Sequence, residues 1–282
     1  MYYLLLSIIC SVSVAALFKI IKEKKVDIFP IIHFNYLLAI IFCYFIFDSN
    51  FYSFTTYSSN MYIYIPLGVL LPVLFLILNK SIQQVGIIKT DIAQRFSLII
   101  PILISIFVWN QEVAIGKIIG LVMAFVAIFL ILYKEQSIKQ NLSFISPILV
   151  LLGYGCVDVM FKKIALIKNI SYTSSLLFIF TLAFIISSIL LIVLKSNTKY
   201  TLKTVKWGLI LGTLNFANIY TYIKAHQGLK DNPTIVFIIM NLGVIILSTI
   251  IGYFIFKEKV SKINIIGIFI ALMAIMVITY LK

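Results

Sequence analysis

The chain has 282 residues, of which 62% are hydrophobic and 11% are charged, and its mean hydropathy is +1.13. A soluble globular domain is roughly 45–50% apolar and about 25% charged, so this composition excludes a soluble enzyme, a soluble nucleic-acid-binding protein and a disordered tail. The net charge of +14 comes mostly from lysines just beyond apolar runs, as is typical of residues that flank membrane spans.

The apolar residues form long runs along the whole chain. A transmembrane α-helix needs about 20 consecutive apolar residues, and ten runs approach this length. The sequence therefore predicts an all-α integral membrane protein with ten transmembrane helices in a lipid bilayer. The runs lie near residues 2–20, 28–47, 61–79, 86–108, 113–133, 143–163, 172–194, 205–224, 233–256 and 263–281.

The fifth and tenth runs repeat one pattern. Residues 117–133 match residues 264–280 at eight of 17 positions, including the run Ile-Ile-Gly. Chance would give about two matches in a chain so rich in isoleucine. The sequence therefore predicts two five-helix repeats, at residues 1–134 and 135–282.

Smaller echoes accompany this match. An acidic residue, Glu112 or Glu258, stands shortly before each copy, and a Phe-Lys pair ends the first and sixth runs at Lys19 and Lys162. Because each repeat holds an odd number of helices, the second must enter the membrane from the opposite side. Such inverted repeats are typical of secondary transporters, whose substrate sites lie near the bilayer midplane between the copies.

These features resemble the EamA type of the drug/metabolite transporter superfamily, and the resemblance covers the whole chain. It implies ten helices and the export or exchange of small metabolites, amino acids or drugs. It also implies that helices three, four, eight and nine line a central cavity. The chain departs from the family in two places: Pro101 aligns with Leu247 in the second repeat, and the first run lacks the common Trp-Gly pair.

The fourth run contains the main candidate for substrate binding. Ionisable groups inside membrane spans are costly and are functional candidates by default. Arg95 is the only arginine of the chain, and its guanidinium suits a carboxylate or phosphate. It could also form a structural pair with Asp91, four residues earlier on the same helix face, or lie at the membrane interface. Gln94 and Asn241, the residue that aligns with Arg95 in the ninth run, are further predicted substrate-binding residues.

Polar residues of the sixth and eighth runs are the remaining candidates. Asp158 is either a proton-coupling site, because a buried carboxylate can exchange a proton with the medium, or half of a structural pair with Lys162; we favour the pair. Asn215, Asn218 and Tyr222 lie on one helix face. They either join helices or line a polar cavity with substrate-binding roles.

Together these features predict a secondary transporter of a small metabolite in the plasma (inner) membrane, working by alternating access. The solute would be an amino acid, an organic acid or an amphiphilic drug-like molecule. The alternative is a non-transporting membrane scaffold or a lipid-interacting protein. We predict no catalytic residues, cofactor, metal site or nucleic-acid partner, and a homo-oligomer remains open. The three cysteines lie inside apolar runs and indicate no disulfide framework.

Two arguments disagree on membrane orientation. Apart from Arg95, 15 basic residues lie in the loops that follow odd-numbered runs, whereas seven lie in the other loops and the termini. The positive-inside rule therefore places both termini outside, whereas the family resemblance implies cytoplasmic termini.

Overall fold

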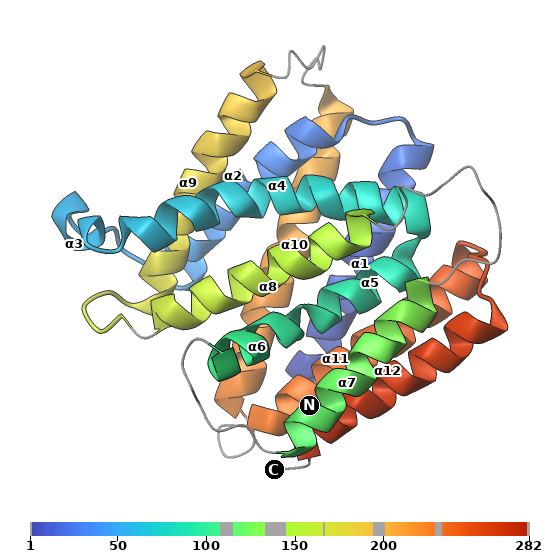
Figure 1. The fold of residues 1–282 in the computed structure, drawn as a ribbon. Coiled ribbons are helices and arrows are strands. Elements are labelled where there is room, and N and C mark those ends of the chain that lie inside the picture. Colours follow the sequence, from blue (N-terminus) through green and yellow to red (C-terminus); the bar gives the residue numbers. More distant parts are fainter. Residues whose placement is uncertain are drawn as a thin grey trace.

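The computed structural model describes residues 2–107, 115–132, 145–165, 167–193, 201–228 and 233–280, and within these ranges it consists of helices and connections without strands (Figure 1). The helices of the first half are α1 (Tyr2–Glu23), α2 (Ile28–Ile46), α3 (Phe54–Ser58), α4 (Met61–Val85), α5 (Ile87–Arg95), η1 (Phe96–Leu98), α6 (Ile99–Phe107) and α7 (Ile115–Leu132). Those of the second half are α8 (Ile145–Ala165), α9 (Tyr172–Val193), α10 (Leu202–Gly228), α11 (Pro233–Ile250), η3 (Ile251–Ile255) and α12 (Lys262–Tyr280).

The helices have the length and surface of a membrane protein. Among the described residues, α1, α2, α4 and α9 are long and apolar enough to cross a bilayer, and shorter apolar helices occur at Ile239–Ile255 and Lys262–Val277. Large apolar side chains such as Phe45, Phe129 and Ile192 are more than two-thirds exposed. A soluble monomer rarely leaves so much apolar surface uncovered, so this is an all-helical membrane protein.

The fourth and ninth apolar runs are not single α-helices. The fourth divides into α5, the 3-10 segment η1 and α6, and the ninth passes from α11 into the π-helix η3. Pro101 gives a physical reason for the first break, because its ring displaces the carbonyl four residues earlier and removes a helical hydrogen bond. That carbonyl belongs to Ser97, inside η1. The short helix α3 is a further element that the sequence analysis missed.

Helices α7 and α12 pack side by side at one edge of the molecule (Figure 1). Ala127 and Ala274 are fully buried in their cluster, and their small side chains allow the two helices to approach closely. The side chain of Asn264 donates hydrogen bonds to the carbonyl oxygens of Leu130 and Ile131, each across 3.0 Å. The repeated pattern of the fifth and tenth runs therefore belongs to a helix pair at the edge of the bundle.

The main hydrophobic core lies between α1, α2, α4, α9 and α10. Its largest buried members include Phe18 and Tyr36, whose rings both meet Phe75 edge to face. Aromatic pairs in this arrangement stabilise a core beyond the area that they bury. This core forms the rigid wall against which the polar residues of α5, α8 and α11 are set.

Candidate functional site

A cavity of about 380 Å³ lies inside the bundle, a volume within the rough range of 300–1,000 Å³ for small-molecule sites. Its lining comes from α1, α2, α4, α5, η1, α8, α9, α10 and α11. Of the nine predicted site residues, Lys162 does not line the cavity. The other eight do: Asp91, Gln94, Arg95, Asp158, Asn215, Asn218, Tyr222 and Asn241.

Arg95 reaches into the cavity from the last position of α5. Its Nη2 donates a hydrogen bond to Ser11 Oγ on α1, across 2.8 Å. Its Nε is buried without a hydrogen-bond partner in the described part of the chain, and so is Oδ2 of Asp91, one turn earlier. Buried polar atoms are rarely left unpaired, so this end of α5 offers both a donor and an acceptor to a ligand.

The predicted structural pair between Asp91 and Arg95 is not formed. Both residues belong to the described part of the chain, where the structure shows no ion pair between them. Sharing a helix face brings two side chains near each other, but the Arg95 side chain extends to Ser11 instead. Arg95 lines the cavity, and its position relative to the membrane interface stays a prediction.

Asp158 lines the cavity from α8 and is held by the broken helix. Ser97 Oγ in η1 donates a hydrogen bond to Asp158 Oδ2, across 2.9 Å. Lys162, one turn further along α8, is exposed and lies outside the cavity lining. The hydrogen bond from Ser97 to Asp158 therefore comes from another helix, and the pair of Asp158 with Lys162 stays a prediction.

The asparagines of α10 both join helices and line the cavity. Asn215 Nδ2 donates to Asn35 Oδ1 on α2, across 3.1 Å, and Ser7 Oγ on α1 donates to Asn218 Oδ1, across 2.6 Å. These asparagines thus do both, whereas their roles in substrate binding stay predictions. Tyr222 on α10 and Asn241 on α11 line the same space.

The sequence analysis missed several groups of this site. Ser11 and Ser97 contact the charged residues, and single serines in apolar runs carry no distinguishing signal. Tyr154 lies between two glycines of α8, a pattern that could have drawn attention to it. Apolar and aromatic side chains complete the lining, among them Leu71, Leu74, Phe75, Phe161, Leu176 and Phe180.

This arrangement can bind a small amphipathic solute. It combines one guanidinium, two carboxylates, several amides and hydroxyls, and apolar side chains in one cavity. A guanidinium binds carboxylates through charge-assisted hydrogen bonds, a carboxylate binds an amine or a proton, and the apolar side chains cover the hydrocarbon part of a solute.

Glu112, the acidic residue noted before the repeated pattern of the fifth run, lies outside the described residues.

Comparison with known proteins agrees with these features. The model of the EamA-like transporter family matches residues 142–280, a range inside the second predicted repeat. An uncharacterized protein of Haemophilus influenzae is 40% identical over 289 aligned residues, which cover all of this chain and 98% of that relative.

Proposed function

We propose that this chain, which belongs to the EamA-like transporter family, is a secondary transporter that carries a small metabolite across the plasma (inner) membrane by alternating access. Arg95 and the cavity around it are the proposed binding site. The observation that carries this proposal is the position of the only arginine, together with two carboxylates, in the lining of a cavity to which both halves of the chain contribute.

The packing of the helices supports ten spans arranged as two inverted repeats, at residues 1–134 and 135–282. Helix α1 packs on α10 and α11, and α8, five apolar runs later, packs on α4 and α5. Likewise α2 packs on α10, and α9, its counterpart, packs on α4. The pairs α2–α9, α5–α11 and α7–α12 each join a helix to its own counterpart. Such reciprocity is what a two-fold axis between the repeats requires.

The cavity lies where these repeats meet. The first half contributes α1, α2, α4 and α5, and the second contributes α8, α9, α10 and α11. The break after Arg95 adds the discontinuous helix that many transporters use at their substrate sites. Rocking of one half against the other would then expose the same residues to each side of the membrane in turn.

The chemistry of the lining favours a solute with a carboxylate and an apolar part, such as an amino acid or an organic acid. Arg95 would bind the carboxylate, and the amides of Asn215, Asn218 and Asn241 would orient it. Asp91 and Asp158 would hold an amino group of the solute or a coupling proton. A purely apolar solute would leave Arg95 Nε and Asp91 Oδ2, which have no hydrogen-bond partner among the described residues, unsatisfied, and this is costly for buried polar atoms.

Ligand-induced stabilisation tests this proposal. The purified protein, Arg95→Ala and the control Lys162→Ala would be heated with amino acids, organic acids, nucleosides, sugar phosphates and cationic drugs. A ligand that binds the folded state must raise the melting temperature. We expect a carboxylate-bearing solute to stabilise the native protein and Lys162→Ala but not Arg95→Ala, and the same solute to enter proteoliposomes that contain the native protein. A protein that neither binds nor transports any member of the panel would contradict the proposal and favour the non-transporting alternative.

A further inference from the structure

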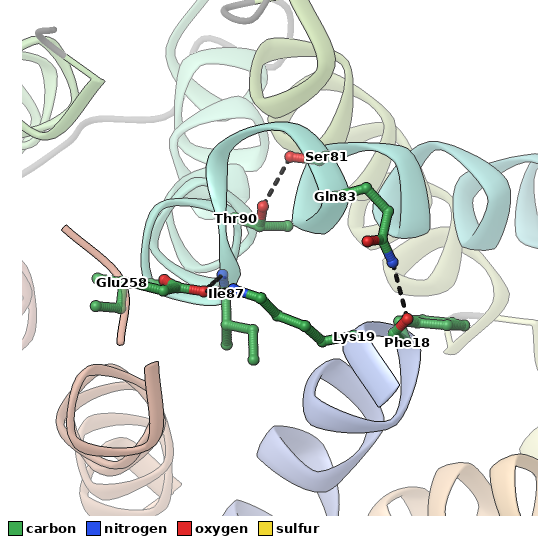
Figure 2. Close-up of polar contacts among 8 residues, drawn as sticks. Phe18, Lys19, Ser81, Gln83, Ile87, Thr90 and Glu258 are labelled. Atoms are coloured by element: carbon green, nitrogen blue, oxygen red, sulfur yellow. Dashed lines mark hydrogen bonds and ion pairs between the residues drawn. The ribbon is translucent and has the colours of Figure 1, made fainter. Parts of the chain in front are cut away.

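Glu258 connects the two halves of the chain at one end of the bundle (Figure 2). It lies between η3 and α12, and its carboxylate accepts hydrogen bonds from the backbone N–H groups of Ile87, across 2.7 Å, and Ile88, across 3.2 Å, at the start of α5. The same carboxylate forms an ion pair with Lys19 near the end of α1. We call this set of contacts, made by Lys19, Glu258, Ile87 and Ile88, the Glu258 junction.

The contacts of the junction are electrostatically matched. The first N–H groups of a helix have no partner within the helix, and the helix dipole makes this end positive. The Glu258 carboxylate therefore accepts hydrogen bonds from two of these N–H groups and interacts favourably with the positive end of the helix dipole. The ammonium group of Lys19 balances the negative charge of the carboxylate. The Glu258 side chain is 9% exposed and that of Lys19 is 22% exposed, so solvent screens these interactions only in part.

The local backbone makes room for this carboxylate. Gly86 precedes α5 with φ +93°, and a Cβ atom there would lie 2.5 Å from Glu258 Oε2. A Cβ on Gly252 would lie 3.0 Å from the same oxygen. Lys257 adopts φ +50°, an uncommon conformation for a side chain other than glycine. Two glycines and a constrained turn thus shape the place that Glu258 occupies.

The junction lies beyond one end of the cavity. On α1, α4 and α5, the cavity-lining residues nearest to this end are Ala15, Leu78 and Asp91. Each is followed, toward the junction, by a side chain that is at most 1% exposed: Phe18, Ile82 and Ile87. Gln83 adds a hydrogen bond from α4 to the Phe18 carbonyl oxygen, across 2.8 Å (Figure 2). The cavity is therefore closed by a packed apolar layer beneath the junction.

The cavity approaches the surface at its other end. Its lining reaches Tyr172, the first residue of α9, which is exposed. The Tyr64 and Ser175 hydroxyls, near the starts of α4 and α9, are hydrogen-bonded across 2.9 Å. Near the end of α4, Gln84 instead contacts Ser146 at the start of α8. Tyr64 and Gln84 are 20 residues apart on α4, so a rise of about 1.5 Å per residue separates these two contacts by roughly 30 Å.

We infer that the Glu258 junction is the contact that keeps the cavity shut at this end, and that it must part when the protein exposes the cavity to that side of the membrane. This inference rests on the proposed function. Glu258 belongs to the second half of the chain, whereas Lys19 and Ile87 belong to the first. The halves cannot separate at this end while the junction holds. Lys19 and Glu258 are thus positioning residues that also hold in place the helix bearing Asp91 and Arg95.

Thiol accessibility tests the inference without any transported solute. The native cysteines Cys10, Cys43 and Cys156 would be replaced by alanine, and Leu78→Cys would place one thiol at the closed end of the cavity. A membrane-impermeant maleimide would be added to right-side-out and to inside-out vesicles. The rates would be compared in this background, in Lys19→Met and in Glu258→Gln. Lys22→Met and Glu23→Gln, at exposed positions of the same helix end, are matched controls.

We expect the thiol to react slowly from the face of the junction. Lys19→Met and Glu258→Gln should each raise that rate by about tenfold, which corresponds to roughly 1.4 kcal/mol, and should not raise the rate from the opposite face. The controls should change neither rate. Unchanged rates in both junction variants would overturn the inference. If Glu258→Gln does not yield folded protein, Lys19→Met carries the test, because it leaves both hydrogen bonds to α5 in place.

The outcome can be separated from that of the proposed function. A protein that moves no solute but shows accelerated labelling in the junction variants would overturn transport and keep the closure. A protein that transports its solute, and whose junction variants label as the background does, would overturn the closure alone.

Discussion

The Arg95 guanidinium donates a hydrogen bond to Ser11 on α1, across 2.8 Å, although a carboxylate, Asp91, lies one turn earlier on the same helix. Arg95 is the last residue of that helix, and both Arg95 and Ser11 line the cavity. The contact leaves Arg95 Nε and Asp91 Oδ2 without partners among the described residues, and it ties the central charge of the site to another helix.

Ser11→Ala should destabilise the protein because it removes the hydrogen-bond acceptor of a partly buried guanidinium. A hydrogen bond to a charged group contributes about 1.5–3 kcal/mol, so we expect the free energy of unfolding in detergent to fall by that amount. Ser13→Ala, on the same helix but outside the cavity lining, should change it by less than about 0.5 kcal/mol. Equal effects of the two variants would contradict the role given to Ser11.

Asn35 and Asn215 should behave as a coupled pair. Asn35 is fully buried and accepts a hydrogen bond from Asn215. Asn215→Leu would leave that acceptor unpaired, at a cost of about 1–3 kcal/mol, whereas replacing both partners with apolar groups can be nearly neutral. We therefore expect the double variant with Asn35→Leu to recover most of the lost stability. A double-mutant cycle of unfolding free energies measures this, and simple additivity would count against the pair.

Gly267→Ala should loosen the α7–α12 pair. A Cβ atom at this position would lie 2.9 Å from the backbone nitrogen of Ile131 and 2.8 Å from its Cγ1. A backbone atom cannot move out of the way as the end of a flexible side chain can. Overpacking of this kind lowers the free energy of unfolding by about 1–3 kcal/mol. Thermal unfolding should show the loss, while ligand binding should be unaffected. Gly228→Ala is the control, because nothing lies within 4 Å of its added Cβ atom.

Asp158→Asn should uncouple transport from protons if Asp158 is the coupling carboxylate. The amide oxygen can still accept the hydrogen bond from Ser97, so we expect the variant to fold. Uptake into proteoliposomes should then no longer respond to a pH gradient across the membrane. Asp48→Asn, at an exposed position outside the cavity, should respond as the native protein does. Uptake by Asp158→Asn that still follows the gradient would exclude Asp158 as the coupling group.

Composition predicted the helical membrane architecture, and the resemblance of the repeated pattern to EamA-type transporters predicted the family; both are confirmed. The rule that charge inside a membrane span is costly selected Arg95, Asp91 and Asp158, and the structure gathers them around one cavity. Their roles in binding and coupling stay predictions. The aligned position Asn241 also lies in this cavity, as the repeat predicts.

The parts that sequence reasoning missed depend on contacts between distant segments. Ser97 lies in the break of the fourth run, and its hydroxyl there donates a hydrogen bond to Asp158 on α8. Ser11 belongs to the site only because the Arg95 side chain donates a hydrogen bond to it. Periodicity along one helix suggested pairs four residues apart, but tertiary contacts determined which groups meet. Glu258 was visible as an acidic residue before a repeated pattern, yet nothing local indicates its contact with Ile87.

That contact spans 171 positions of the chain, which has a consequence for biosynthesis. A ribosome adds roughly 5–20 residues per second, so α5 waits about 10–35 s before Glu258 exists to cap it. During this interval its first N–H groups need water, lipid headgroups or the insertion machinery as temporary partners. The helix that carries Arg95 therefore reaches its final position late, when almost the whole protein has been made.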